Sequence, residues 1–291
     1  MLALQCIEAG IPEDAYINLL ASSKDIDALI ASRHVQGVSL TGSENAGAAV
    51  AAQAGKHLKK VVLELGGSDP LLVLDNGNLP LSVKAAVTGR FANAGQACIS
   101  SKRLIVLDEA YDEFADSLAQ AVSGIACGDP MDPKTFLGPL YSAAAKEEIL
   151  DIVDDALAQG AQLLVGSATE RTGDAFMEPM VLTGVTPQMR AFHEEIFGPV
   201  AVLLRAQDTD HAVDLANDSP YGLGATVFST DLDQAHAVAD QLEAGMVVIN
   251  GMAGSQPDLP FGGTKRSGFG RELGAAGIME FANKKLIRTP A

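Results

Sequence analysis

The stretch "VQGVSLTGSENAG", residues 35–47, together with "KKVVLEL", residues 59–65, decides the fold class of this 291-residue chain. Each stretch contains an apolar run as long as a buried strand, and the alanine-rich residues between the runs have the composition of a helix that ends near His57. A strand, a helix and a second strand make a βαβ unit, whose strands lie parallel. The sequence therefore predicts an α/β protein.

The alternation of helices and strands continues on both sides of this unit. The expected helices are residues 1–9, 25–32, 79–95 (ending at Gly95), 109–125 and 146–160, and the expected strands are residues 70–74, 102–107 and 161–166. Two later helix-to-strand passages, residues 211–230 and 231–250, have similar layouts. They predict a second α/β domain from about Gly66 to about Leu259.

The C-terminal part has a different character. Residues 260–274, "PFGGTKRSGFGRELG", form a glycine-rich stretch that we expect to be a loop leading into a helix. Residues 283–290, "NKKLIRTP", have the composition of a short basic strand, which is able to pair with another subunit.

Composition and charge exclude several classes of protein. The formal net charge of -17, with no long basic run, argues against nucleic acid as a partner. The apolar runs are far shorter than the roughly 20 residues of a membrane helix, and the N-terminus lacks the basic region of a signal peptide. We therefore expect no membrane partner and a cytoplasmic location. The three cysteines and five histidines lack metal-site spacing, so free thiols and no metal are predicted.

Cys98, in "NAGQACISSKR", is the first candidate for chemistry. A lone cysteine between Ala97 and Ile99 is most often a small core residue. Here, however, it follows a helix that ends in glycine, and Lys102 and Arg103 are close in sequence and able to favour a thiolate. A thiolate that attacks a carbonyl also needs a carboxylate to activate water and donors for the oxyanion.

Glu64 is the candidate carboxylate. It ends the apolar strand "VVLEL", where burial would raise its pKa toward that of a useful base. A solvated glutamate at a strand end explains the same spacing, and both interpretations stay open at this point.

Two further stretches suggest a cofactor. Gly42 and Ser43 lie between a strand and a helix, where free amides are able to face a phosphate, although a plain helix N-cap is the more common explanation. In "EEIFGPV", one acid is able to bind a ribose diol, although an ordinary surface corner has the same composition.

Taken together and in this order, "LTGS", "LELGG", "GQAC", "EEIFGPV" and "PFGGTKRSGFGRE" resemble the aldehyde dehydrogenase superfamily along essentially the whole chain. The "ELGGSDP" version is most similar to bacterial NAD(P)-dependent succinate-semialdehyde dehydrogenases. The resemblance implies a partial Rossmann-type cofactor domain and an α/β catalytic domain. The implied boundaries are residues 1–65 for the cofactor part, 66–259 for the catalytic domain, 260–280 for a return to the cofactor part, and 281–291 for an oligomerisation strand of a dimer or tetramer.

The resemblance also assigns roles to residues. Cys98 becomes the nucleophile that forms a thiohemiacetal and then a thioester with a small aldehyde, and Glu64 becomes the base that activates the hydrolytic water. The implied contacts to NAD or NADP come from Gly42, Ser43, Leu65, Gly66, Glu195 and Phe197. Because acylating relatives generally lack the acid at the position of Glu64, release of a free acid is expected.

Two departures from the family pattern matter. The chain has no tryptophan and lacks the proline-tryptophan-asparagine stretch that the family places upstream, so it resembles an N-terminally truncated enzyme. Ala92 stands where some succinate-semialdehyde enzymes carry an arginine for the substrate carboxylate, which leaves the aldehyde open. The alternative to an oxidoreductase is a truncated remnant that folds and associates without turnover.

Overall fold

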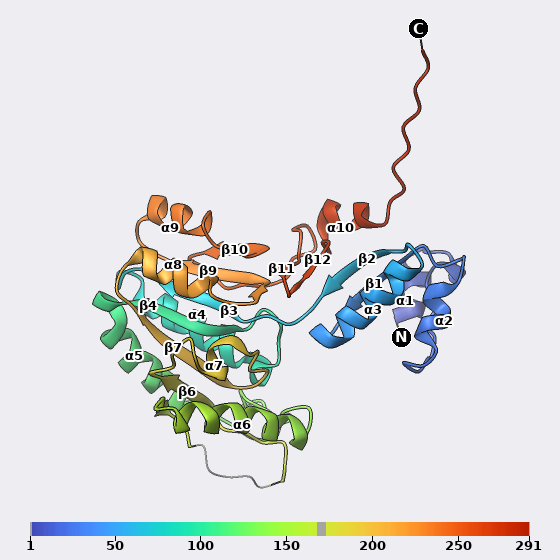
Figure 1. Ribbon diagram of the computed structural model, residues 1–291. Coiled ribbons are helices and arrows are strands. Elements are labelled where there is room, and N and C mark those ends of the chain that lie inside the picture. The colour runs from blue at the N-terminus through green and yellow to red at the C-terminus, as the bar shows by residue number, and fades with distance from the viewer. Residues whose placement is uncertain (1, 168–172, 291) are drawn as a thin grey trace.

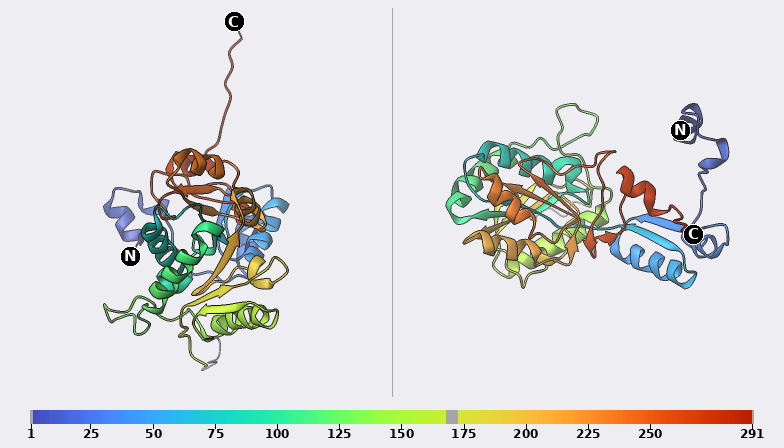
Figure 2. Two further views of the ribbon diagram at one scale, coloured as in Figure 1. Left: turned by 90° about the vertical axis from the view of Figure 1, so that its left-hand side faces the viewer. Right: turned by 90° about the horizontal axis from the view of Figure 1, so that it is seen from above.

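The computed structural model describes residues 2–167 and 173–290, which form a three-stranded and a seven-stranded sheet joined by a short connection, together with one two-stranded pair (Figure 1). In the smaller sheet, β1 (Gly37–Thr41) pairs in parallel with β2 (Lys60–Glu64), and α3 (Glu44–Lys56) connects them. The predicted βαβ unit is therefore confirmed. α2 (Ile26–Ala31) packs against α3, whereas α1 (Leu2–Glu8) and the 3-10 turn η1 (Glu13–Ala15) lie further out, away from the sheet (Figure 2).

The larger sheet has seven strands in the order β10-β9-β3-β4-β7-β6-β5. Its strands are β3 (Asp69–Val73), β4 (Ser101–Leu107), β5 (Gln162–Val165), β6 (Met180–Thr183), β7 (Val200–Ala206), β9 (Gly224–Phe228) and β10 (Met246–Ile249). All pairings are parallel except that of the edge strand β5 with β6. Every residue of β3 and β4 is buried, as expected for strands covered on both faces.

Helices cover both faces of this sheet (Figure 2). One face carries α4 (Leu79–Phe91) and α5 (Asp108–Ser123), and the other carries α8 (Thr209–Asn217) and α9 (Leu232–Ala239). From β3 to β4 the chain moves toward one edge of the sheet, and from β7 to β9 it moves toward the other edge. Because crossovers between parallel strands are right-handed, this change of direction places the two helix pairs on opposite faces. The remaining helices are α6 (Ala143–Ala158), α7 (Arg190–His193) and α10 (Gly274–Glu280).

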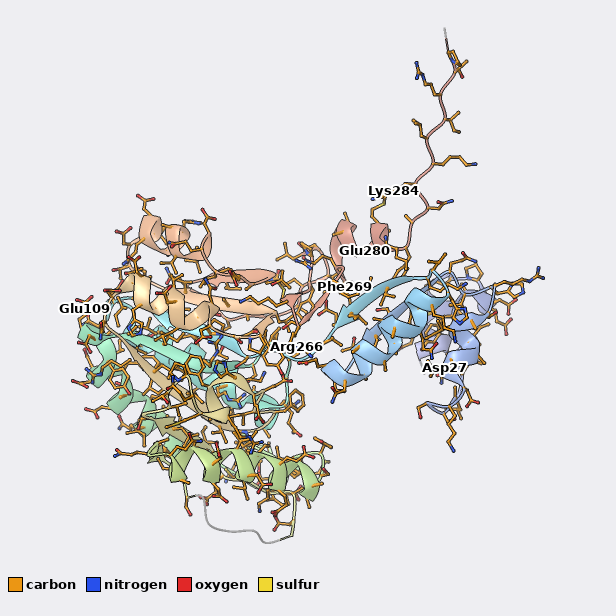
Figure 3. The ribbon with its side chains drawn as sticks, in the orientation of Figure 1. Asp27, Glu109, Arg266, Phe269, Glu280 and Lys284 are labelled. Atoms are coloured by element: carbon orange, nitrogen blue, oxygen red, sulfur yellow. The ribbon has the colours of Figure 1, made fainter. Side chains whose placement is uncertain are left out.

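The glycine-rich stretch near the C-terminus joins the two sheets rather than forming a simple loop. It contains β11 (Thr264–Lys265), which pairs with β8 (Tyr221–Gly222), and β12 (Gly268–Phe269), which pairs antiparallel with β2. Between these short strands, Arg266 forms an ion pair with Glu44 at the start of α3 (Figure 3). This return of the chain fixes the position of the small sheet against the large one.

One expected helix boundary was wrong, and two strands were missed. The helix expected to run to Gly95 ends at Phe91, and Ala92–Gly95 form a separate 3-10 turn in which Asn93 and Ala94 have left-handed φ values of 53° and 54°. The turn reverses the chain so that the residues after it reach the start of β4. The strands β6 and β7 were not expected, although β7 lies between β4 and β6 inside the large sheet.

The C-terminal segment beyond α10 runs away from both sheets (Figures 1 and 3). Leu286 and Ile287 are 89% and 82% exposed, and Lys284 lies on the same extended stretch. Residues 282–290 pair with no strand within residues 2–167 and 173–290. In the described part of the chain, no helix combines the length and the hydropathy needed to cross a membrane.

Candidate active site

The candidate residues meet where the two sheets face each other. Glu64 is the last residue of β2, and the connection from Leu65 to Ser68 leads from there into the first residue of β3. Cys98 precedes β4, the neighbour of β3, so it lies at the amino-terminal edge of the large sheet. The carboxyl end of one sheet therefore supplies the acid, and the amino end of the other supplies the thiol.

Cys98 is half-buried, and its surroundings act on its thiol in opposite directions. Burial raises the pKa of the Cys98 thiol, and the nearby carboxyl groups of Asp69 and Glu64 add to this. The ammonium of Lys102 and the N–H of Ile99 lower the same pKa, but the net direction is upward. The expected thiolate character is thus opposed by burial in this chain.

Only one of the two basic residues expected near the thiol contributes to its environment. Lys102 Nζ lies 3.1 Å from the carbonyl oxygens of both Ala97 and Cys98. Arg103 points elsewhere and donates to the carbonyls of Ser68, Leu215 and Ala216, at 3.0, 2.7 and 2.9 Å. Alternation along β4 sends consecutive side chains to opposite faces, which explains the difference.

Glu64 is buried, with 3% of its surface exposed. Neither carboxyl oxygen has a hydrogen-bond partner among the described residues. Burial raises the pKa of Glu64 from 4.5 to about 7, with a further rise from Glu272 and an opposing effect of Arg271. The interpretation as a solvated strand-end glutamate is therefore wrong, and the predicted rise in pKa is confirmed.

Glu195 lies against the connection between the sheets. Its Oε1 accepts the N–H of Gly67 at 3.0 Å and lies 3.3 Å from Lys102 Nζ. Its other oxygen occupies the space that a side chain on Gly66 would need, so a larger residue at position 66 would displace the carboxylate. Phe197, two residues further, is 37% exposed.

The other residues predicted to hold the cofactor lie at the carboxyl ends of β1 and β2. The Ser43 hydroxyl accepts the N–H of Ala46 at 3.3 Å, so it caps α3, and Gly42 N–H donates to the carbonyl of Glu64 at 3.0 Å. Leu65 is buried, and its N–H donates to Ser267 at 3.0 Å. The helix N-cap interpretation of "TGS" is thus confirmed, whereas a phosphate contact stays a prediction.

Sequence reasoning missed two buried ionisable residues at this site. Asp69 accepts the N–H of Gly224 at 3.0 Å with Oδ1, while Oδ2 has no partner among the described residues. Burial raises the pKa of Asp69 to about 7, against the opposing charges of Lys102 and Arg103. The signal that was available is an acid at the first position of an otherwise apolar strand, "DPLLV".

Arg90 is the second missed residue, and it is fully buried. Its guanidinium donates to Val200 at 2.7 Å and Ile196 at 2.8 Å, to the Ser100 hydroxyl at 2.7 Å, to the carbonyl of Gly95 at 3.4 Å, and to the carbonyl of Gly198. These contacts join the turn before Cys98 to the segment after Glu195. An arginine inside the largely apolar helix "LPLSVKAAVTGRF" was the available signal.

Comparison with known proteins identifies the family. The family model described as "Aldehyde dehydrogenase family" matches residues 1–287. The chain belongs to the aldehyde dehydrogenase family. A protein named succinate-semialdehyde dehydrogenase, NADP(+), from Deinococcus radiodurans is 57% identical over 281 residues, which are 97% of this chain and 59% of that relative. Succinate semialdehyde dehydrogenase Sad of Escherichia coli K12 is 46% identical over 280 residues, 96% of this chain and 61% of Sad.

Solved structures of this family have the same fold. The succinic semialdehyde dehydrogenase of Streptococcus pyogenes, crystallised with NADP+, superposes with a TM-score of 0.94 at 44% identity, over 100% of this chain and 64% of that one. The betaine aldehyde dehydrogenase of Staphylococcus aureus, crystallised with NAD+, gives a TM-score of 0.84 at 34% identity, over 90% of this chain and 53% of that one. The chain thus spans about three fifths of the length of the curated relatives that it matches.

Two hollows of this aldehyde dehydrogenase family member border the site. One, of about 220 Å³, is lined by Ala97 and Ile99, the two neighbours of Cys98 in sequence, and also by Ala92, Asn93 and Met252. The other, of about 370 Å³, is lined by Glu195 and Phe197 together with Tyr141 and residues of α6. The thiol loop, residues 96–100, therefore has one hollow beside it, and two of the six predicted cofactor residues border another.

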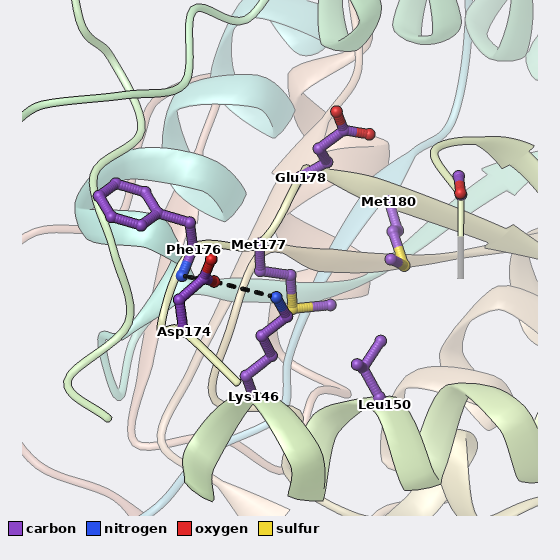
Figure 4. Close-up of a pocket in the computed structure, with 8 residues that line it drawn as sticks. Lys146, Leu150, Asp174, Phe176, Met177, Glu178 and Met180 are labelled. Atoms are coloured by element: carbon purple, nitrogen blue, oxygen red, sulfur yellow. Dashed lines mark hydrogen bonds and ion pairs between the residues drawn. The ribbon is translucent and has the colours of Figure 1, made fainter. Parts of the chain in front are cut away.

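A third hollow, of about 320 Å³, lies between α6 and β6 and is lined by other residues (Figure 4). Lys146 on α6 reaches across it to Asp174, with Nζ 3.2 Å from Oδ1. Leu150, Met177 and Met180 are among its other lining residues. None of the predicted site residues lines this hollow.

Proposed function

We propose that Cys98 and Glu64 are the catalytic pair of an NAD(P)-dependent aldehyde dehydrogenase that oxidises a small aldehyde, succinate semialdehyde, to the carboxylic acid. The observation that carries the proposal is the buried Glu64, whose two oxygens have no partner among the described residues and whose charge acts on Cys98. A structural carboxylate is normally hydrogen-bonded when buried. One without partners, with a pKa of about 7, suits a general base.

The residues of the chain perform the steps as follows. The Cys98 thiolate adds to the aldehyde carbonyl, and the Cys98 N–H donates to the oxyanion of the thiohemiacetal. Loss of hydride converts this adduct into a thioester on Cys98. Glu64 then accepts a proton from a water molecule that attacks the thioester, which releases the carboxylic acid and the Cys98 thiolate.

The residues present fit one end of a nicotinamide cofactor. Glu195 and Phe197 border the hollow of about 370 Å³, and Gly66 leaves room for the Glu195 carboxylate. Gly42 and Ser43 lie at the N-terminus of the 13-residue helix α3, which favours an anion, and Leu65 lies beside them. When bound, NAD(P)+ supplies the hydride acceptor. We propose these six residues as its contacts.

The substrate is proposed from the relatives and from the hollow beside Cys98. The relatives from Deinococcus radiodurans and Escherichia coli are both named for succinate semialdehyde. Ala92 lines the hollow of about 220 Å³ and leaves space there for a short aldehyde. We also keep the expected domain boundaries, and residues 281–291 as an oligomerisation strand, as part of this proposal.

Acylation by an activated ester tests the catalytic pair without any cofactor. With p-nitrophenyl acetate, we expect a burst of nitrophenolate equal to the enzyme concentration and acetyl on Cys98 by peptide mass spectrometry. Glu64→Gln should keep the burst and slow the following turnover by about 100-fold, because only hydrolysis of the thioester needs the base.

Two cysteine variants show which thiol is acylated. Cys127→Ser should leave the burst unchanged, whereas Cys98→Ser should abolish it. Acetyl on Cys6 or Cys127 instead of Cys98 would refute the nucleophile, and equal loss of burst and turnover in Glu64→Gln would refute the base. A normal burst without reduction of NADP+ in the presence of succinate semialdehyde would favour the alternative, a chain that folds without oxidising aldehydes.

A further inference from the structure

The ammonium of Lys102 contacts backbone carbonyls of the thiol loop and the carboxylate of Glu195. Lys102 is 2% exposed, and it contacts three acceptors: the carbonyl oxygens of Ala97 and Cys98, each at 3.1 Å, and Glu195 Oε1 at 3.3 Å. An ammonium has three N–H donors, so this one has a partner for each. Its partners belong to two separate segments, the thiol loop and the segment that carries Glu195.

We propose that Lys102 is the positioning residue of the nucleophile, which orients the two peptide groups on either side of Cys98 and couples them to Glu195. The proposal rests on the proposed function, in which Cys98 is the nucleophile. It adds a role for a residue that contacts neither the aldehyde nor the hydrolytic water.

Peptide geometry gives the first argument. In a trans peptide group, the carbonyl and the following N–H point in opposite directions within one plane. Holding the Ala97 carbonyl therefore directs the Cys98 N–H away from the ammonium, and this N–H is the proposed donor to the oxyanion. Holding the Cys98 carbonyl directs the Ile99 N–H in the same way, and this N–H lowers the pKa of the Cys98 thiol.

The charges around the thiol give the second argument. The ionisable groups that act on Cys98 are Lys102, Asp69 and Glu64. Lys102 is the one cation among them, and it is itself faced by Arg90, Glu195 and Asp69. Without its ammonium, the thiol would face two carboxyl groups and no cation. The thiolate would then be harder to form.

The pH dependence of Cys98 alkylation by iodoacetamide tests the proposal on the chain as it exists. In Lys102→Met, we expect the midpoint of the alkylation rate to move to higher pH by about one unit, and the rate at neutral pH to fall about tenfold. The ester burst should slow as well, because the oxyanion donor loses its orientation. Lys146→Met is the matched control, since Lys146 is also buried and paired with an acid, Asp174, in the separate hollow of Figure 4.

The outcomes are distinct. An unchanged midpoint in folded Lys102→Met, or an equal shift in Lys146→Met, would overturn the role of Lys102. If Lys102→Met does not fold by circular dichroism, Glu195→Gln decides, because it removes the opposing charge and keeps an acceptor for Gly67 N–H. Its midpoint should move to lower pH, and an unchanged or higher midpoint would overturn the coupling. If Cys98 is not the first thiol alkylated in the unsubstituted chain, the proposed function fails instead.

Discussion

Glu64→Gln should stabilise the folded chain at alkaline pH, although it removes the proposed base. Glu64 is buried without a hydrogen-bond partner among the described residues, and its pKa rises from 4.5 to about 7 on folding. A carboxyl with a raised folded pKa contributes stability that is fully present below the unfolded pKa of 4.5. This contribution is lost as the pH rises through about 7, because the fold must then hold a desolvated charge.

The two pKa values set the magnitude. At about 1.4 kcal/mol per pKa unit, the interval from 4.5 to about 7 corresponds to a total of about 3 kcal/mol in the free energy of unfolding. The sequence pI of about 4.5 makes the protein least soluble at the lower end of this range. Between about pH 5.5 and about pH 8.5, about 2 kcal/mol of the total is accessible.

Urea unfolding at these two pH values measures the effect. We expect Glu64→Gln to gain about 2 kcal/mol relative to the unsubstituted chain on going from the lower to the higher pH. Replacing the carboxyl by an amide also has an effect that is the same at both pH values, and this effect cancels when the two stability differences are compared. Glu109→Gln, at an exposed position at the start of α5 (Figure 3), is the control and should show no such change. The same stability difference for Glu64→Gln at both pH values would refute the desolvated carboxylate.

Three other predictions concern the packing around the site and the C-terminal segment. Arg90→Met should lower the free energy of unfolding by at least about 3 kcal/mol in urea, because it leaves several buried carbonyls without a donor, and Arg90→Lys should not restore it, because an ammonium lacks the planar fork. Gly262→Ala should lower the free energy of unfolding by about 1–3 kcal/mol and slow hydrolysis of the Cys98 thioester, because φ of Gly262 is +150° and the new methyl would lie 2.7 Å from Glu64 Oε1. Normal stability and turnover of this variant would contradict this. Deleting residues 283–291 should reduce the mass measured by light scattering without changing Cys98 alkylation; an unchanged mass would exclude this segment from self-association.

Local patterns were sufficient to predict much of the fold. The βαβ unit follows from two apolar runs around an alanine-rich segment, and these signals depend only on neighbouring residues. The strand β7, "VAVLLRA", was missed because a continuous apolar run after a Gly-Pro corner has no period that separates strand from helix. Its place between β4 and β6 is set by pairing across the sheet.

The site was predictable as far as it depends on single residues. The raised pKa of Glu64 follows from its position at the end of an apolar strand. The turn at Asn93 and Ala94 was not predictable, because non-glycine residues, alanine above all, rarely adopt left-handed φ values, and the Gly95 carbonyl of this turn is held by Arg90. For Lys102, the sequence indicated proximity to Cys98, but its contact with Glu195 depends on a segment far along the chain.

The place of β3 between β4 and β9 has a consequence for how the chain reaches its native state. The Asp69 carboxylate accepts from Gly224, 155 residues later, and Leu71 lies opposite Thr226 in the adjoining strand. Closing so long a loop carries an entropic cost that nearby contacts do not repay. During synthesis, β3 and β4 emerge long before β9, so the edge of β3 that β9 later covers stays open with its apolar residues exposed. Nascent chains of this protein therefore present an unpaired strand edge until about residue 228 has left the ribosome, and we expect them to be most prone to aggregation during this interval.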